Sequence, residues 1–252
     1  MTTDGNPTGR ERADRLLVER GLYESRARAQ AAIAAGLVRA DGRTVLRPSD
    51  MLARAAALEA QEPWPWVSRG GLKLVHALEA GAIDVAGAGA LDVGASTGGF
   101  TDVLLARGAR RVYAVDVGRG QLHPRLRERA EVVSLEATDI RTLPRAAIPE
   151  PIDLVTIDVS FIGLAQVLAP ALAFAGPGAT LVALVKPQFE VGRRHLAKGG
   201  IVKDAQARAE ALAQVEHHLA GLGWQTRLRL DSPITGGDGN AEFLLVAGRA
   251  RG

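Results

Sequence analysis

The chain has 252 residues, of which 47% are hydrophobic and 23% charged, and its formal net charge is +3. These values are ordinary for a soluble globular protein with one substantial domain and a small one. The absence of cysteine excludes a disulfide framework and a thiolate metal site, and we expect no bound metal. The N-terminus lacks the apolar core of a secretory signal, and Gly-Pro-Gly interrupts the longest apolar stretch, 171–185. We therefore expect a cytoplasmic protein that does not bind membranes, and in that stretch a helix end, a turn and a buried strand.

The first expected unit is a small α+β module. Its periodicity predicts a helix over 12–20, a second helix over 25–35 with Ser25 as its cap and Gly36 at its end, and a hairpin over 37–45. Arginines cluster from the second helix onward: Arg26, Arg28, Arg39, Arg43 and Arg47. On charge alone, a solvated surface explains this cluster better than a binding site does.

The pattern of the module favours RNA binding. The stretch LLVERGLYESRARAQAAIAAGLVRADGRTVLRPSD, residues 16–50, resembles the alpha-L RNA-binding module of a small-subunit ribosomal protein, pseudouridine synthases and tyrosyl-tRNA synthetases. Arginines at a helix start and a hairpin suit phosphates and RNA shape rather than base edges. The resemblance therefore implies RNA contacts by Arg26, Arg28, Arg39 and Arg43. We expect this domain to span 1–60, followed by a semi-rigid linker over 61–67 that contains two prolines.

The second expected domain spans 68–252, where strand and helix patterns alternate. Such alternation implies a mostly parallel sheet with helices on both faces. A leading helix is predicted over 68–81 and a long helix from Asp204 to about Leu222. The predicted strands are 90–94, 111–118, 132–139, 153–161, 180–190, 224–231 and 242–248. The last two leave no room for a crossover helix, which predicts an antiparallel closing hairpin in a seven-stranded Rossmann-like α/β fold.

The stretch LDVGASTGGFTDVLLARG, residues 91–108, joins a strand to a helix through a glycine-rich turn. Residues 94–98 match the G-x-S-x-G of a hydrolase nucleophile elbow. That fold places several strands before the serine and an acid followed by a histidine after it. Here Ser96 follows the first strand of its domain, and among the downstream histidines only His195 remains a candidate partner. The elbow interpretation is therefore disfavoured.

A nucleoside-binding loop explains the same turn better. In the dinucleotide pattern G-x-G-x-x-G, Ser96 stands at the second glycine, which weakens the grip on a pyrophosphate. Asp116 follows the second strand at the distance of a ribose-binding carboxylate, and Asp139 follows the third strand, placed to accept from an adenine amino group. Each aspartate taken singly is equally well a turn or cap residue. The set predicts S-adenosylmethionine as cofactor, bound by Gly94, Ser96, Gly98, Gly99, Phe100, Asp116 and Asp139.

Charged residues gather at the expected ligand edge of the sheet. Two predicted strands end in Asp158 and Lys186, an antiparallel last strand would begin at Glu242, and Lys73 on the leading helix could reach the same edge. Each of the four is singly explained as a strand-end ion pair. Only four of the 31 basic residues are lysines, and two are in this set. Because two partly desolvated amines each favour the other's neutral form, Lys186 is expected to take the proton of a ribose 2′-hydroxyl that attacks a sulfonium methyl.

Motifs along the whole chain resemble those of the TlyA family, whose members carry the labels haemolysin and ribosomal RNA 2′-O-methyltransferase. They are SRGGLKL, DVGASTGGFTD, TIDVSF, LVKPQFEVGR, GGIVKD and SPITGGDGNAEFLL. The second domain also resembles FtsJ-type methyltransferases, whose Lys-Asp-Lys-Glu tetrad maps onto Lys73, Asp158, Lys186 and Glu242. The resemblance implies methylation of cytidine 2′-hydroxyls in ribosomal RNA within ribosomal subunits, with S-adenosylmethionine as donor. The oligomeric state is not determined by the sequence, and a monomer is expected.

Two functions of other classes remain as alternatives, a membrane-active haemolysin and a non-catalytic ribosome-binding assembly factor. The chain also departs from the family pattern at three positions. Trp64 stands where mycobacterial relatives carry arginine in the linker, Asp139 replaces an asparagine, and Gly163 replaces a serine. The first departure puts in doubt how the linker couples RNA docking to cofactor binding. The second keeps a hydrogen-bond acceptor and adds a charge.

Overall fold

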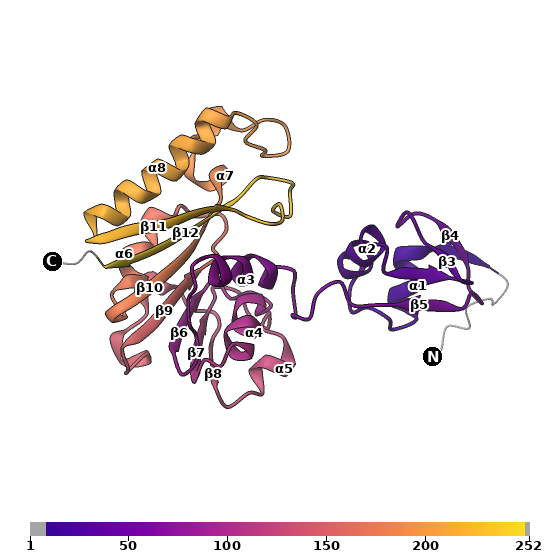
Figure 1. The fold of residues 1–252 in the computed structure, drawn as a ribbon, viewed down its shortest axis with the longest axis horizontal. Helices are drawn as coiled ribbons and strands as arrows, with labels where there is room; N and C mark the ends of the chain where they lie inside the picture. The colour runs from indigo at the N-terminus through magenta and orange to yellow at the C-terminus, as the bar shows by residue number, and fades with distance from the viewer. Residues whose placement is uncertain (1–8, 250–252) are drawn as a thin grey trace. The chain divides into compact units, whose positions relative to one another are not determined.

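The computed structural model describes residues 9–249, apart from the side chain of Arg193. The chain divides into two compact units, and the division falls between Pro65 and Trp66, within the stretch expected to be a linker. Figure 1 shows unit 1 from indigo to violet and unit 2 from violet through orange to yellow.

Within its described residues, 9–65, unit 1 contains two helices and two small sheets. The helices are α1 (Ala13–Glu19) and α2 (Arg26–Ala34). The strands are β1 (Arg10–Arg12), β2 (Val38–Ala40), β3 (Arg43–Thr44), β4 (Met51–Ala53) and β5 (Leu58–Ala60). The expected β2–β3 hairpin is present, and the Ser25 side chain caps α2 by accepting from the Arg28 backbone N–H. Strands β1, β4 and β5 were not predicted, because segments of three residues carry no readable periodicity.

A buried carboxylate ties the two helices of unit 1 together. The side chain of Asp14 is fully buried, and Arg12 Nε donates to its Oδ1 over 3.1 Å. Arg26 Nη2 and Gln30 Nε2, both on α2, each donate to Oδ2 over 2.7 Å. These donors, the Arg12 hydrogen bond first, hold the pKa of Asp14 well below its usual value. Arg26 therefore has a structural task as well as the RNA contact expected of it.

Unit 2 is built on one large sheet, which within the described residues has seven strands. They are β6 (Gly89–Val93), β7 (Arg111–Val115), β8 (Val132–Leu135), β9 (Ile152–Ile157), β10 (Ala175–Val185), β11 (Trp224–Asp231) and β12 (Phe243–Arg249). The order is β11-β12-β10-β9-β6-β7-β8, and only β12 runs antiparallel to its neighbours. This arrangement confirms the predicted Rossmann-like fold and its antiparallel closing hairpin.

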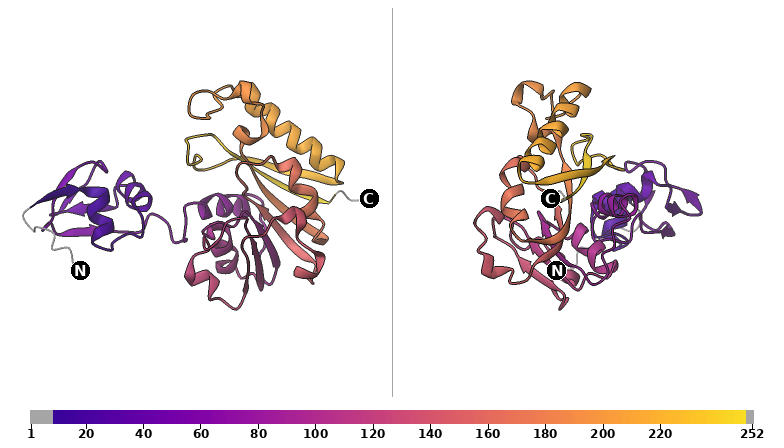
Figure 2. Two further views of the ribbon diagram at one scale, coloured as in Figure 1. Left: turned by 180° about the vertical axis from the view of Figure 1, so that it is seen from behind. Right: turned by 60° about the vertical axis from the view of Figure 1, so that its left-hand side comes forward.

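Helices cover both faces of this sheet (Figures 1 and 2). The helices of unit 2 are α3 (Gly71–Ala80), α4 (Gly99–Ala106), α5 (Pro124–Arg127), α6 (Leu168–Leu172), α7 (Pro187–Glu190) and α8 (Ala205–Gly221). Short 3₁₀ turns occupy Ile140–Thr142, Arg145–Ala147, Leu164–Gln166 and Arg193–His195. Leu154 packs into the core under α3 and α4, whereas its neighbour Val155 packs into the core under α6 and α8. Successive strand residues thus face opposite layers, as alternation along a strand requires.

The prediction of a turn at Gly-Pro-Gly, residues 176–178, is wrong, because β10 passes through these residues. The pairing of β10 with β9 shifts register between Ala175 and Thr180, so the intervening residues bulge out of the ladder. Proline has no N–H to donate and Gly178 has φ +75°, which suits a bulge rather than a regular ladder.

The topology brings several strand ends to one edge. Strand β6 lies between β7 and β9, so the strand order reverses there, and ligands of such sheets bind at the carboxyl ends of the strands beside this point. Because β12 is antiparallel, its first residue Phe243 pairs with Val185, the last residue of β10. Glu242 and Lys186 are therefore carried to the same edge.

Candidate active site

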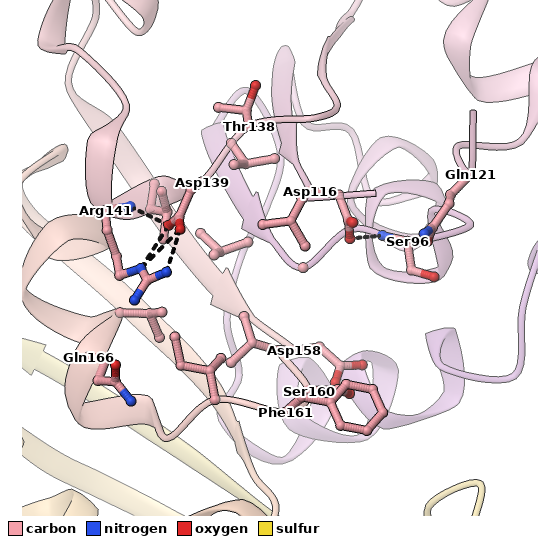
Figure 3. Close-up of a pocket in the computed structure, with 18 residues that line it drawn as sticks. Ser96, Asp116, Gln121, Thr138, Asp139, Arg141, Asp158, Ser160, Phe161 and Gln166 are labelled. Atoms are coloured by element: carbon pink, nitrogen blue, oxygen red, sulfur yellow. Dashed lines mark hydrogen bonds and ion pairs between the residues drawn. The ribbon is translucent and has the colours of Figure 1, made fainter. Parts of the chain in front are cut away.

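The turn between β6 and α4 forms the centre of the site. Gly94 has φ +82°, and a Cβ there would overlap the backbone carbonyl of Asp158. Ser96 has φ +48° and donates its backbone N–H to Asp116 Oδ2 over 2.8 Å. Asp116 Oδ1 accepts from the Gly118 N–H over 2.7 Å. Asp116, which follows β7, thus holds the glycine-rich turn in place (Figure 3).

Gly98 and Gly99 serve packing around this turn. A Cβ on Gly98, whose φ is +96°, would collide with the side chains of Leu122 and Leu126. A Cβ on Gly99 would collide with Ser68 Oγ. Gly99 lines the smaller of two cavities described below, whereas Gly98 lines neither. Gly98 therefore supports the turn by packing against Leu122 and Leu126, and its role toward a cofactor stays a prediction.

A cavity of about 650 Å³ opens at the ends of β6, β7 and β9. Its wall includes the expected cofactor residues Gly94, Ser96, Asp116 and Asp139, together with Asp158. Nucleoside-sized ligands occupy cavities of about 300–1,000 Å³. The carboxylate beyond each of two strands, Asp116 and Asp139, suits the hydroxyl and amino groups of an unphosphorylated nucleoside. The residues present therefore fit S-adenosylmethionine.

Asp139 faces a partner that the sequence did not suggest. Arg141 Nε lies 3.0 Å from both carboxylate oxygens of Asp139, and Arg141 Nη2 donates to Oδ2 over 2.6 Å (Figure 3). The Arg141 hydrogen bonds hold the pKa of Asp139 below its usual value. The charge that aspartate adds relative to the family's asparagine is thus balanced within the cavity wall.

A second cavity, of about 300 Å³, adjoins the first. Both lysines of the expected tetrad, Lys73 and Lys186, line it, as do Gly99 and Phe100. The two cavities share wall residues: Gly94, Ser96, Asp158 and Ser160. The larger cavity thus holds the two expected cofactor carboxylates, Asp116 and Asp139, the smaller one holds the amines together with Gly99 and Phe100, and Asp158 lines both.

The structure brings the four charged residues together as two pairs. Lys186 Nζ lies 2.6 Å from Asp158 Oδ1 and donates to Ser160 Oγ over 2.8 Å. The contact with Oδ1 is a close ion pair without an aligned hydrogen bond. Lys73 Nζ pairs with Glu242 Oε2, and both side chains are nearly fully buried. Each amine thus has a carboxylate as ion-pair partner, and the structure shows which carboxylate belongs to which amine.

Sequence reasoning missed a buried acid beneath the site. Asp92 on β6 has no exposed surface and accepts hydrogen bonds from Thr101 Oγ1 over 2.7 Å and Thr156 Oγ1 over 3.0 Å. Burial raises its pKa to about 6, and the charge of Asp158 adds to the shift. The sequence signal that could have identified Asp92 is an aspartate inside an otherwise apolar predicted strand.

Phe161 is a second residue that was missed. It lines the larger cavity, is 92% exposed, and has φ +65°, an unfavourable conformation for a bulky residue. Its ring contacts that of Phe189 with centroids 5.2 Å apart. An exposed aromatic ring beside Asp158 and Ser160 is suited to stack against a base.

The arginines expected to bind RNA differ in what they contact in unit 1. Arg28 is only 12% exposed: its Nε lies 2.5 Å from Glu62 Oε2, its Nη2 donates to the Trp64 carbonyl over 3.0 Å, and its guanidinium lies 5.5 Å from the Trp64 ring centroid. Arg39 donates to the Gly42 carbonyl over 3.0 Å, and Arg39 and Arg43 are exposed on the hairpin. The hairpin arginines are thus presented to solvent, whereas Arg28 secures the start of the linker.

Comparison with known proteins gives the family. The family described as FtsJ-like methyltransferase matches residues 66–249, and the S4 domain matches residues 11–55. The "16S/23S rRNA (cytidine-2'-O)-methyltransferase TlyA" of Mycobacterium tuberculosis is 48% identical over 94% of this chain and 89% of its own length. The chain belongs to the TlyA family. Its membership, its methyltransferase fold and its nature as an enzyme confirm the predictions made from the motifs.

Solved structures agree with membership of the TlyA family. A structure named "Putative hemolysin from Streptococcus thermophilus" has a TM-score of 0.76 and 38% identity, covering 96% of this chain and 90% of that one. A "putative S-adenosylmethionine dependent methyltransferase from Listeria monocytogenes" has a TM-score of 0.55 at 14% identity, covering 73% of this chain and 100% of that one, which shows the fold alone. The fold and family are those of S-adenosylmethionine-dependent methyltransferases, and hemolysin is an alternative label for proteins of this architecture.

Two features are absent from residues 9–249. None of their helices combines the length and the apolar character needed to cross a membrane. In the same part of the chain, no three His, Asp or Glu side chains are grouped so as to hold a metal ion.

Proposed function

We propose that this chain is an S-adenosylmethionine-dependent 2′-O-methyltransferase that acts on cytidine ribose in ribosomal RNA within ribosomal subunits. The observation that carries the proposal is the shared wall of the two cavities, where Lys186 and Asp158 meet beside the glycine-rich turn. A donor in the larger cavity and a ribose in the smaller one would face each other across this wall. The name of the M. tuberculosis relative supports ribosomal RNA cytidine as the substrate.

The larger cavity supplies the groups that a methyl donor needs. When bound, S-adenosylmethionine supplies an electrophilic methyl group on a sulfonium. Asp116 would hold the ribose hydroxyls, and Asp139, kept ionised by Arg141, would accept from the adenine amino group. Gly94 and Ser96 would line the methionine end of the donor. The absence of a Cβ at Gly94 leaves room for the backbone carbonyl of Asp158.

The smaller cavity supplies the groups that act on the acceptor. Lys186 would take the proton of the attacking 2′-hydroxyl, and the methyl group would pass to the hydroxyl oxygen from the sulfonium sulfur, which leaves as a neutral thioether. Asp158 and Ser160 hold Nζ at the shared wall, which fixes the direction of proton transfer. Glu242 holds Lys73 in the same cavity, where its ammonium can bind the ribose oxygens. An arginine could not replace Lys186, because it stays protonated.

A direct test uses tritiated methyl groups from S-adenosylmethionine and ribosomal subunits from cells that lack the protein. We expect label to enter the RNA in 30S or 50S particles, to resist alkaline cleavage as a 2′-O-methyl nucleotide does, and to map to cytidine. Label in ribosomal protein, or on a base rather than a ribose, would refute the proposal. Naked RNA and intact subunits in parallel reactions would show whether the assembled particle is required.

Unit 1 is the proposed RNA-docking domain. The S4 match and the exposed hairpin arginines support this role. A protein that acts on ribosomal subunits would work in the cytoplasm, and that location is part of the proposal. We expect the Arg39→Ala/Arg43→Ala double variant to lose about tenfold in affinity for subunits and to bind S-adenosylmethionine unchanged, because two phosphate contacts are removed. Filter binding at several salt concentrations measures the affinity for subunits, and calorimetry measures the affinity for S-adenosylmethionine.

The matched comparison for this double variant is Arg28→Ala. It removes the contacts to Glu62 and Trp64, so we expect a lower melting temperature with a smaller loss of subunit affinity. Equal subunit affinity of the double variant and the wild type at matched salt would contradict RNA docking through the hairpin.

A further inference from the structure

Two loops of unit 2 carry motifs that the chemistry above does not use. Residues 192–203, which follow α7, contain GGIVK, and residues 232–241, which connect β11 to β12, contain SPITGGDGN. The first loop comes shortly after Lys186 in the chain, and the second ends directly before Glu242. Both project from the same side of unit 2 in the two opposite views (Figures 1 and 2). The loops therefore flank the catalytic edge.

A buried asparagine joins the two loops. Asn240 is 1% exposed, its Oδ1 accepts from the Val202 backbone N–H over 2.9 Å, and its Nδ2 donates to the Gly200 carbonyl over 3.1 Å. Its own carbonyl accepts from the Gly236 N–H over 2.9 Å. One side chain thus satisfies backbone groups of the first loop from a fixed position in the second. Because an unmade buried hydrogen bond is costly, this contact holds the two loops in one arrangement.

The first loop makes a tight turn where Asn240 holds it. Ala197 N–H donates to the Ile201 carbonyl over 2.9 Å, and Gly200 N–H donates to the Ala197 carbonyl over 3.0 Å. Gly199 and Gly200 have φ values of +83° and +76°, which non-glycine residues avoid. This geometry puts Lys198 at the exposed tip of the turn.

The charge of the first loop points to a polyanion, whereas the second loop carries one acidic residue, Asp238, and no basic one. Residues 191–203 contain Arg193, Arg194, Lys198 and Lys203 and no acidic residue. Lys198 and Lys203 are the two lysines outside the catalytic tetrad, and both are exposed. The second loop borders the acceptor cavity through Arg69, which lines that cavity and has its Nη2 3.8 Å from the position of a Cβ on Gly237. One further cation, Arg69, thus lies between the second loop and the cavity in which the ribose would react.

We propose that loops 192–203 and 232–241, joined by Asn240, form a phosphate-binding wall beside the acceptor cavity, in which Lys198 contacts a phosphodiester of the RNA strand whose ribose enters that cavity. Asn240 is a positioning residue, since it acts on RNA only through the Lys198 turn. Lysine suits this contact because a phosphate on a passing strand needs a point charge rather than a fixed bidentate geometry. The identity of the polyanion as substrate RNA rests on the proposed function.

The test compares Lys198→Gln, Lys198→Arg and Asn240→Ala with the charge-matched control Arg111→Ala, which removes an exposed cation at the amino end of β7, the opposite edge of the sheet. For Lys198→Gln we expect KM for ribosomal subunits to rise about fivefold, kcat at saturation to change by less than twofold, and the salt slope of RNA binding to fall by about 0.7–0.9. Lys198→Arg should keep the wild-type slope. S-adenosylmethionine affinity should be unchanged in all variants.

Asn240→Ala should raise KM as Lys198→Gln does, and the double variant should be no weaker than either single variant, because both remove the same contact. A wild-type salt slope for Lys198→Gln, or fully additive losses in the double variant, would overturn the proposal. If Asn240→Ala fails to fold, the comparison of Lys198→Gln with Lys198→Arg alone decides whether the proposal holds. If the wild type methylates no RNA, the proposed function fails, and RNA-binding isotherms of the same variants still decide whether the wall binds phosphates.

Discussion

The Lys186→Ala variant is expected to lose methyl transfer by about 10²–10⁴-fold in kcat while binding S-adenosylmethionine as the wild type does. Lys186 Nζ stands at the wall shared by the two cavities, 2.6 Å from Asp158 Oδ1. Without it, no other group is held by Asp158 and Ser160 to take the hydroxyl proton. Single-turnover transfer of tritiated methyl to ribosomal subunits measures the loss directly, since it excludes product release.

The Lys186→Arg variant separates proton transfer from charge. Arginine keeps the positive charge and can pair with Asp158, but it cannot become a neutral base, so we expect this variant to remain as slow as Lys186→Ala. Activity within tenfold of the wild type in Lys186→Arg would show that the cation only orients the ribose. Melting temperatures close to the wild type in both variants would exclude loss of fold as the cause.

The second large effect is expected in unit 1, where Asp14→Ala should destabilise the unit by about 3 kcal/mol, the lower end of the range for breaking a buried ion pair. The Asp14 side chain is fully buried and accepts from Arg12, Arg26 and Gln30. Both arginines are about half exposed, so after the substitution they can turn to water, which limits the loss. Hydrogen exchange of the α1 and α2 amides in the full chain measures the stability of this unit separately from unit 2.

The pH dependence of unit 1 follows from the same carboxylate. The pKa of Asp14 is lowered in the folded protein, so its ionised form contributes stability that is present above the unfolded value of 3.8 and is lost as pH falls through the folded value. Asp14→Asn should therefore remove part of the acid sensitivity of unit 1 and lower its stability near pH 7. An unchanged acid transition in Asp14→Asn would contradict this assignment. Asp92 acts with the opposite sign in unit 2, because burial raises its pKa.

Local signals in the sequence were sufficient for most elements of unit 2. Asp204 caps α8 by accepting from the Gln206 N–H, and α8 ends at Gly221 before Leu222, as the periodicity predicted. The parallel strands were readable because a buried parallel strand is a continuous apolar run bounded by turn residues, and β11 was readable from its alternation of apolar and polar residues. Strand β8 ends at Leu135 rather than at 139, because nothing local marks where sheet pairing stops.

The candidate site was readable to the level of residue types. Charged residues that follow buried strands must gather at one edge of a parallel sheet, so Asp158 and Lys186 could be placed together from the sequence. Which carboxylate pairs with which amine could not be predicted from the sequence. The register of β12 on β10 and the reach of α3 decide that Glu242 pairs with Lys73 and Asp158 with Lys186. Residue spacing likewise gives no signal for three other hydrogen bonds, which join Arg141 to Asp139, Arg28 to Trp64, and Asn240 to Val202.

The sequence by itself determined the order of elements, the glycine-rich turn after the first strand of unit 2, and the acids and amines available at its edge, since these depend on residues a few positions apart. Only the tertiary structure decided which amine meets which carboxylate, that Gly94 packs against the Asp158 backbone and Gly98 against leucine side chains, and that the two cavities share a wall. Those features arise where segments far apart in the chain come within hydrogen-bonding distance, and a sequence read locally carries no record of such distances.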